Sequence, residues 1–464
     1  MTQLDDILAR VDAEIPASLE RLFELIRIPS VSTEASYAPD CRRAAEWLRA
    51  ELDSLGFAAT VRDTAGHPMV VAHGPAVAGP HVLFYGHYDV QPVDPLNLWH
   101  TAPFEPSLAL QPDGETHILG RGASDDKGQL LTFIEACRAW KSVTGTLPIQ
   151  VSMLFEGEEE AGSPSLGPFL EEHGSDLRAD IMLVCDTDMW DRDTPAITTM
   201  WRGFVSEEFT ISCGDRDLHS GMFGSAARNA AQVIGTIIGK LRNDDDGSVA
   251  IPGFYDGVVE LPQAIADQWN RLPFDAEKFL SDVGLTTPAG ETGRSVLEQV
   301  WARPTCEING VWSGYTGDGF KTVIPAEASA KLSFRLVAGQ DPHRIRQLFR
   351  DYVQGLLPPD CTVSFKAYAA APAQAMPLDG ALLNSARAAL TDEWGCEAAL
   401  AGTGGSIPIL GEIKRRLGMD ALLIGFGRFD NRIHSPNEKY DLSSFHKGIR
   451  SWVRILSAFS ETRP

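Results

Sequence analysis

The sequence has little that would tie it to a membrane or to nucleic acid. None of its windows approaches about 20 apolar residues, the length that a membrane-spanning helix needs. Its first stretch, MTQLDDILARVDAEIP, carries acids and no long apolar run, so we expect no secretory signal. Positive charge is also scarce, because 40 Lys and Arg stand against 63 Asp and Glu, a net charge of −23. Such an acidic surface argues against nucleic acid and anionic membranes as partners and suits small ligands or cations.

Cysteine is sparse and unclustered. An odd number of cysteines without a CxxC pair argues against a cysteine zinc cluster and is typical of reduced thiols in a cytosol. We therefore expect a cytoplasmic protein with reduced thiols. The cysteines stand singly at seven positions: Cys41, Cys137, Cys185, Cys213, Cys306, Cys361 and Cys396.

The chain of 464 residues is 44% hydrophobic, enough for a sizeable core and two or three domains. Up to about residue 200, apolar strands alternate with amphipathic helices, which predicts an α/β domain with a largely parallel sheet. We expect helices at 4–27 (interrupted at Pro16), 40–55 and 128–140, and strands at 58–63, 69–74, 81–86, 149–157 and 180–186.

The pattern then changes to strand, helix, strand, strand, helix, strand, which is the order of a ferredoxin-like unit. After Pro377 the first pattern returns, so we predict a discontinuous domain of residues 1–200 and 376–464, with residues 201–375 inserted. The inserted elements are expected at 203–212, 226–241, 305–313, 327–337, 341–356 and 361–369, with 243–304 as a further insertion. The returning elements are expected at 379–394, 421–427 and 443–460.

Polar side chains gather where predicted strands end or helices begin. Open α/β sheets bind ligands beyond the carboxyl ends of their strands, and histidines with carboxylates suit Zn²⁺ or a similar ion. Three carboxylates beside two divalent ions would leave a charge of about +1, which a hydroxide would neutralise. The stretches concerned are HVLFYGHYD, GASDDKG, the EGEEE that follows a strand, DIMLVCDTD and HSPNEK.

Each of these motifs has a simpler explanation when it stands alone. HxD after a strand is usually a turn histidine with a capping Asp, EGEEE a solvated turn, and SDDKG a helix N-terminus. LHSG (218–221) and GTGGS (402–406) are weak signals by themselves. The recurrence of acids at successive strand and helix ends favours a single metal site.

Together, GHYDV, GRGASDDKG, EGEEEAGS, CDTD, DLHSGMFG and HSPNEK resemble the motifs of the M20 family of co-catalytic metallopeptidases, over nearly the whole chain. DLHSGMFG, KTVIP, GGSIP and HSPNEK are most similar to its cytosolic dipeptidase and carnosinase branch. The resemblance implies a mixed α/β fold. A largely parallel sheet would be sandwiched by helices, as in zinc peptidases, and the inserted ferredoxin-like α+β domain (201–375) would serve as lid and dimerisation domain.

The resemblance also implies a role for each candidate residue. Asp89 would orient a metal-binding histidine, and Glu159 would be the general base, although Glu158 leaves a second register open. Two divalent ions, Zn²⁺ first and Mn²⁺ or Co²⁺ as alternatives, would share Asp125 among five ligands: His87, Asp125, Glu160, Asp186 and His434.

Most of the remaining functional groups would come from the inserted domain. His219 would reach a partner subunit's site and stabilise the oxyanion, unless it is a core histidine. Arg335 would hold a substrate carboxylate, unless it is a solvated charge on a strand. Further substrate contacts would come from Thr322, Gly405 and Ser406.

The implied activity is hydrolysis of the amide bond of a small dipeptide-like substrate by a metal-activated water, in a cytoplasmic homodimer. An N-acyl-amino-acid deacylase or carbamoylase would use the same metal site. A metal-binding protein without catalysis is disfavoured, because Glu159 and every ligand candidate are present.

Overall fold

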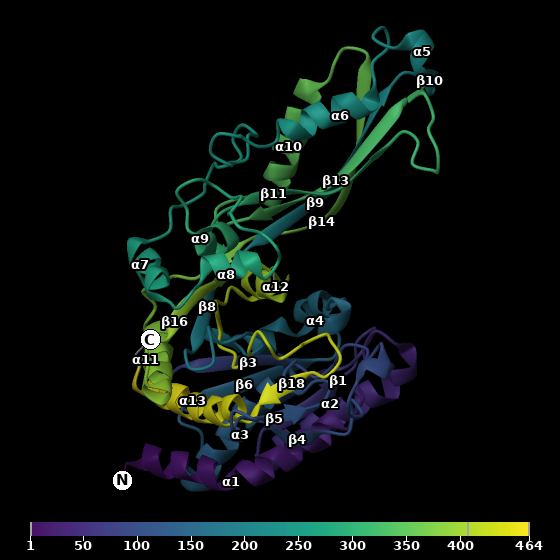
Figure 1. The fold of residues 1–464 in the computed structure, drawn as a ribbon. Helices are drawn as coiled ribbons and strands as arrows, with labels where there is room; N and C mark the ends of the chain where they lie inside the picture. Colours follow the sequence, from purple (N-terminus) through teal and green to yellow (C-terminus); the bar gives the residue numbers. More distant parts are fainter. Residues whose placement is uncertain (1, 406–407, 463–464) are drawn as a thin grey trace. The chain divides into compact units, whose positions relative to one another are not determined.

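The computed structural model describes residues 2–405 and 408–462. The chain forms two compact units, which are coloured along the sequence in Figure 1. The first unit consists of Met1–Thr199, Met376–Ala401 and Glu412–Pro464. The second consists of Met200–Ala375 and Gly402–Gly411, and its last stretch lies outside the inserted domain that the sequence predicts.

The largest sheet among the described residues has nine strands and is mixed. Its central neighbours are parallel: β6 (Gln150–Glu156), β3 (His81–His87), β7 (Ile181–Val184) and β17 (Ala421–Leu423). Antiparallel pairs extend it with β1 (Ala58–Arg62), β2 (Met69–His73), β8 (Ala196–Trp201) and β15 (Gln374–Ala375), and β16 (Ala399–Thr403) pairs with β8. A mixed α/β fold with a parallel centre is what the sequence predicts, and the fold class is confirmed.

Helices pack on this sheet, and a small antiparallel sheet joins the first unit (Figure 1). Phe84 of β3 stacks on Phe133 of α3 with ring centroids 3.9 Å apart, and Trp452 of α13 meets Phe84 edge-on at 5.8 Å. The helices of the first unit are α1 (Gln3–Ile26), α2 (Ala38–Ser54), α3 (Lys127–Thr144), α4 (Leu166–His173), α11 (Ala381–Trp394) and α13 (Leu442–Glu461). A further helix, α12 (Pro408–Leu417), begins in the second unit and ends in the first. The small sheet contains β4 (Ser107–Leu110), β5 (Thr116–Leu119) and β18 (Lys439–Asp441).

Pro16 does not interrupt α1, contrary to the sequence-based expectation. A proline inside a helix removes one backbone hydrogen bond. The buried face of α1, which includes Leu19, Leu22 and Leu25, continues past Pro16 and packs in the core. Burial of that apolar stripe therefore outweighs the missing bond.

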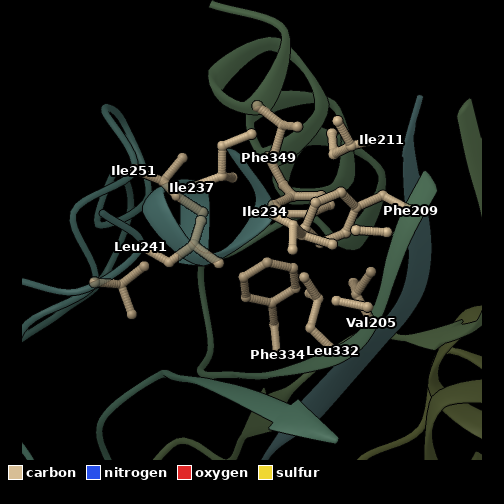
Figure 2. Packing of buried hydrophobic residues seen from close by; sticks show 14 of the residues in the cluster. Val205, Phe209, Ile211, Ile234, Ile237, Leu241, Ile251, Leu332, Phe334 and Phe349 are labelled. Atoms are coloured by element: carbon tan, nitrogen blue, oxygen red, sulfur yellow. The ribbon is translucent and has the colours of Figure 1, made fainter. Parts of the chain in front are cut away.

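The second unit is built on a four-stranded antiparallel sheet in the order β11-β13-β9-β14, which is the strand order of a ferredoxin-like unit. Figure 2 shows its core, where Phe209, Phe334 and Phe349 pack with Ile234 and Leu332. The elements are β9 (Gly203–Cys213), α6 (Ala230–Gly239), β11 (Thr305–Ser313), β13 (Glu327–Leu336), α10 (Pro342–Leu356) and β14 (Cys361–Ala371). Shorter ones are β10 (Leu218–His219), α5 (Ser220–Phe223), α7 (Gln263–Arg271), α8 (Ala276–Ser281), α9 (Val296–Trp301) and β12 (Val323–Ile324).

Two cysteines of the second unit are joined by a disulfide, so the expectation that all thiols are reduced is wrong. Cys213 of β9 and Cys361 of β14 are register partners on neighbouring antiparallel strands, with Cα atoms 4.5 Å apart. They are 148 residues apart in the sequence, so spacing gave no sign of the pair. The other five cysteines are free.

The described residues contain no helix that is both long enough and apolar enough to cross a bilayer.

Candidate metal centre

The candidate site lies where the parallel strands of the first unit end. β3 ends at His87, and β7 ends two residues before Asp186. β6 ends at Glu156 and leads into residues 157–164, here called the acid loop. Asp125 stands just before α3. The sheet therefore delivers side chains from distant parts of the chain to one edge, as open α/β sheets do.

Five side chains form two adjoining donor groups that share Asp125. The first group is His87, Asp125 and Asp186, and the second is Asp125, Glu160 and His434; within each, one donor atom per residue lies within 4.8 Å of the others. Oδ1 of Asp125 is 3.1 Å from His87 Nε2, whereas its Oδ2 is 3.0 Å from His434 Nε2. One carboxylate thus faces both groups, which is the arrangement that two neighbouring divalent ions require.

The electrostatics of the donor groups fit bound cations. Hydrogen bonds with Asp125 and Glu160 raise the pKa of His434 to about 10. Burial lowers the pKa of His87, but hydrogen bonds with Asp125 and Asp89 outweigh it and raise that pKa well above its ordinary value. Burial and the charge of Asp125 raise the pKa of Asp186 well above its ordinary value. The carboxylates therefore attract positive charge, and the histidine nitrogens together with the carboxylate oxygens suit Zn²⁺ or a similar ion.

Asp89 connects the first donor group with the acid loop. It is fully buried, and its Oδ1 lies 3.3 Å from His87 Nδ1. The backbone N–H groups of Glu159 and Glu160 donate to Oδ1 at 3.3 Å and to Oδ2 at 3.0 Å. The backbone carbonyl of Asp89 lies 3.1 Å from His87 Nδ1 as well. These contacts favour a proton on Nδ1 of His87. The lone pair of Nε2, on the side of Asp125, is then available to bind a cation.

The three glutamates of the acid loop differ in surroundings. Glu160 belongs to the second donor group. Burial raises the pKa of Glu159, the nearby charge of His87 lowers it, and the charge of Glu160 raises it again, with a net rise. Glu158 is buried, and its carboxylate accepts backbone N–H groups from His67 and Ser165.

His434 takes a left-handed backbone conformation, with φ of 60°. Such a conformation is unfavourable for a residue with a side chain and persists only when its surroundings enforce it. Asn437, also left-handed at 65°, accepts the His100 N–H at 2.7 Å and donates to the Leu98 carbonyl at 2.9 Å. These bonds fix the loop that carries His434.

Sequence reasoning gave no role to three residues that support the donor groups. Buried Glu438 accepts the N–H groups of Ser124 and Asp125 at 2.9 and 3.1 Å, and so fixes the shared ligand candidate. Gln91 donates to Glu160 Oε2 at 2.6 Å. Asp126 accepts the N–H of His87 at 3.1 Å, and burial raises its pKa to about 8. Glu438 stands inside HSPNEK, where the motif itself could have indicated it.

The remaining predicted residues belong to the second unit, whereas the donor groups belong to the first. His219 is exposed, and its Nδ1 accepts the Gly221 N–H at 3.0 Å at the start of α5. The Thr322 carbonyl accepts the Ser220 N–H at 3.1 Å, so Thr322 lies beside this segment.

Arg335 lies on β13 close to a second arginine. Burial and the charge of Arg335 lower the pKa of Arg202 to about 10. The Nε of Arg202 donates to the Gly404 carbonyl at 3.3 Å, next to exposed Gly405. Ser406 lies outside the described residues.

A pair of adjoining donor groups with a shared carboxylate, at the carboxyl ends of parallel strands, defines the class of hydrolases that use two metal ions together. Comparison with known proteins narrows this class. The model of peptidase family M20/M25/M40 matches residues 83–458, so the chain belongs to this family and is a metallopeptidase by membership. The resemblance found in the motifs is thereby confirmed.

Several known proteins are similar over most of this chain. Cys-Gly metallodipeptidase dug1 of Schizosaccharomyces pombe is 28% identical over 99% of both chains. Human β-Ala-His dipeptidase is 28% identical over 82% of this chain and 74% of its own. The structure of the M20 metallo-carboxypeptidase Sso-CP2 of Sulfolobus solfataricus has a TM-score of 0.78 and 29% identity, covering 96% of this chain and 99% of the other.

Proposed function

We propose that this protein is a dipeptidase that hydrolyses the amide bond of a small dipeptide. The observation that carries the proposal is the shared carboxylate of Asp125, which faces two donor groups beside Glu159. Two of the similar proteins are named as dipeptidases, for Cys-Gly and for β-Ala-His.

The site residues divide the work between cation binding and proton transfer. We assign His87, Asp125, Glu160, Asp186 and His434 as ligands of two divalent ions, Zn²⁺ with Mn²⁺ or Co²⁺ as alternatives. When bound, these ions would polarise the scissile carbonyl and acidify a water molecule. Glu159 takes the proton of the attacking water and returns it to the leaving amine. The raised pKa of Glu159 suits this task, because a base works best with a pKa near the operating pH.

Asp89 keeps His87 in the tautomer that this chemistry needs. Its carboxylate and carbonyl hold the proton on His87 Nδ1, so the lone pair of Nε2 is available for a cation bound with Asp125 and Asp186. The same carboxylate fixes the backbone of Glu159 and Glu160. A single buried anion therefore aligns a ligand and the general base.

The second unit supplies the contacts to substrate in this proposal. Arg335 binds the substrate carboxylate, and Thr322, Gly405 and Ser406 add polar contacts. His219 stabilises the oxyanion in the site of a partner subunit. Residues 1–200 and 376–464 form the catalytic domain and 201–375 form the lid, except that the short stretch Gly402–Gly411 belongs to the second unit.

We further propose that the lid domain makes the protein a homodimer. β11 lies at the edge of its sheet and exposes Ile308 (38%), Val311 (53%) and Trp312 (44%). An exposed edge strand with apolar side chains is a surface that another chain can cover. A second copy of this chain is the proposed occupant.

A cytoplasmic location completes the proposal. It rests on the reduced state of the five free cysteines, whereas the Cys213–Cys361 disulfide argues for an oxidising compartment. Thiol alkylation in intact cells, read by mass spectrometry, separates the two, because a cytosolic pool should leave Cys213 alkylated.

A panel of substrates tests the activity. Dipeptides, N-acyl amino acids, N-carbamoyl amino acids and longer peptides are assayed with Zn²⁺, Mn²⁺ or Co²⁺, with Glu159→Gln as the inactive control. Dipeptides should be cleaved fastest. Preference for the N-acyl or N-carbamoyl compounds would support the deacylase or carbamoylase alternative, which uses the same metal site.

Subunit mixing tests the role of His219. His219→Ala and Glu159→Gln are each expected to be nearly inactive, since loss of one oxyanion donor costs about 3–4 kcal/mol. In a mixed dimer one of the two sites is intact if His219 acts across the interface, so activity should return. Verified subunit exchange without recovered activity would exclude the partner contribution.

A further inference from the structure

Glu158 has no part in the proposed reaction, yet it is one of the most constrained residues of the acid loop. It is 5% exposed, and it belongs to neither donor group found in the described residues. Its Oε1 accepts the His67 N–H at 3.1 Å, and its Oε2 accepts the Ser165 N–H at 3.2 Å. A buried carboxylate shared by two separate backbone segments acts as a tether between them.

The tether fixes the loop from both sides. His67 lies between β1 and β2, and Ser165 directly precedes α4. The carbonyl of Glu158 also accepts the N–H groups of Ala161 at 3.0 Å and Ser163 at 2.8 Å, which close the turn that contains Glu159. The position of Glu158 therefore sets the position of the two glutamates that follow it.

Gly66 provides the space that the Glu158 carboxylate occupies. A Cβ on Gly66 would lie 1.6 Å from Glu158 Oε1 and 2.6 Å from its Cδ. The φ of Gly66 is outside the left-handed region, so its backbone would accept alanine. The three atoms nearest to the added methyl all belong to the Glu158 carboxylate, so we expect substitutions at the two positions to depend on each other.

The acid loop borders open space on this side. A cavity of about 480 Å³, lined in part by Thr64, Gly66, Glu158 and Pro164, adjoins it. Loss of the tether would leave the loop held by Asp89, by the Gln91 amide at Glu160 and by the Ser163 hydroxyl, which donates to Glu156. A misplacement of about 1 Å in a reacting group can reduce a rate about 100-fold.

We propose that Glu158 is a positioning residue of the active site, with Gly66 as its partner. Its carboxylate holds the acid loop so that Glu160 stays in the second donor group and Glu159 faces the reacting water. The inference rests on the proposed function, in which Glu160 binds a cation and Glu159 moves the proton. Glu158 itself touches neither.

A double-mutant cycle of Gly66→Ala and Glu158→Ala tests this proposal. Zn²⁺ binding to the metal-depleted protein is measured by calorimetry, and kcat and KM are measured with a dipeptide. Each single variant should weaken binding at one of the two ion sites about 10- to 100-fold and lower kcat up to about 100-fold with little change in KM. The double variant should match Glu158→Ala within about twofold, because the new methyl group enters the vacated space.

Two matched variants control for general damage. Gly167→Ala would place its Cβ at an ordinary 3.5 Å from Arg416 Nη2, and Glu172 is 79% exposed. Gly167→Ala and Glu172→Ala should keep the Zn²⁺ affinity and kcat of the wild type. A merely structural role of Glu158 would lower Tm in Gly66→Ala and leave the affinity and kcat of the folded protein unchanged.

The proposal is overturned if both single variants keep wild-type Zn²⁺ affinity and kcat. It is also overturned if Gly66→Ala lowers affinity and kcat as much in the Glu158→Ala background as it does in the wild type. Should Gly66→Ala not fold, Glu158→Ala and Glu158→Gln decide, and unchanged Zn²⁺ affinity in both rejects the role. Failure of the proposed function is distinct: a wild-type protein that binds two ions and cleaves no dipeptide refutes that function but still permits the calorimetric cycle.

Discussion

Asp89→Asn removes one charge from the buried connection between His87 and the acid loop, with almost no change in shape. The asparagine keeps one acceptor oxygen, so it can satisfy the N–H of either Glu159 or Glu160 but not both. It also loses the negative charge 3.3 Å from His87 Nδ1. A hydrogen bond to a charged group contributes about 1.5–3 kcal/mol, which corresponds to roughly 10- to 150-fold in an equilibrium constant.

The measured effect should appear in metal binding as well as in rate. Partners of metal-bound histidines typically contribute about 10- to 100-fold to metal affinity, in agreement with the hydrogen-bond figure. Calorimetric titration of metal-depleted Asp89→Asn with Zn²⁺ should show this loss, and kcat should fall with it. Asp63→Asn, at a carboxylate that is 77% exposed, is the control and should bind as the wild type does. Unchanged affinity at both ion sites of Asp89→Asn would refute the role given to Asp89.

Four further outcomes are expected. Glu159→Gln should retain two metal ions by elemental analysis and lose about 10²- to 10⁴-fold in kcat; loss of the metals instead would make Glu159 a ligand. Without bound cations His434 has a pKa of about 10 and is protonated at neutral pH, so binding must expel a proton. The apparent Zn²⁺ affinity should therefore rise with pH below that value, and a binding enthalpy independent of buffer would contradict this. Glu207 is buried between two arginines, and Glu207→Ala should reduce the free energy of unfolding in urea by about 3 kcal/mol, whereas an unchanged midpoint would make the ion pairs dispensable. Cys361→Ser should destabilise the oxidised protein by about 2–5 kcal/mol and leave the dithiol-reduced protein unchanged; equal loss in both states would point to packing.

Local patterns predicted the helices and strands well, because the spacing of buried positions in a strand or helix appears directly as a spacing of apolar residues in the sequence. In β9 the residues of GFVSEEFTISC are alternately buried and half-buried along the whole strand, as the alternation of the letters indicates. The predicted start of the next helix, at 226, is four residues early. α6 begins at Ala230 because the side chain of Asn229 accepts the Ala231 N–H there, and the alanines before it look helical without being in the helix.

Long-range pairing could not be predicted in the same way. Glu438 holds the N–H of Asp125 across 313 residues, and the two disulfide cysteines are 148 residues apart. No local period marks such pairs, since each residue by itself is compatible with a solvated position. Only the order of the motifs indicated that distant side chains meet at one site, and it indicated this for the candidate metal ligands alone.

The roles of the three glutamates in the acid loop cannot be predicted from residue type. Glu158, Glu159 and Glu160 are chemically identical, and no preference of the residue type can assign one to a tether, one to proton transfer and one to a cation. The turn after β6 separates them: it directs the first carboxylate to the N–H groups of His67 and Ser165 and the last into the second donor group. Among the described residues no backbone N–H donates to the carboxylate of the middle residue, and burial raises its pKa, which favours its taking up a proton. The role of each glutamate is therefore set by backbone direction, and Gly66→Ala, which adds one methyl group on a different segment, should disturb the functions of Glu159 and Glu160 without touching either.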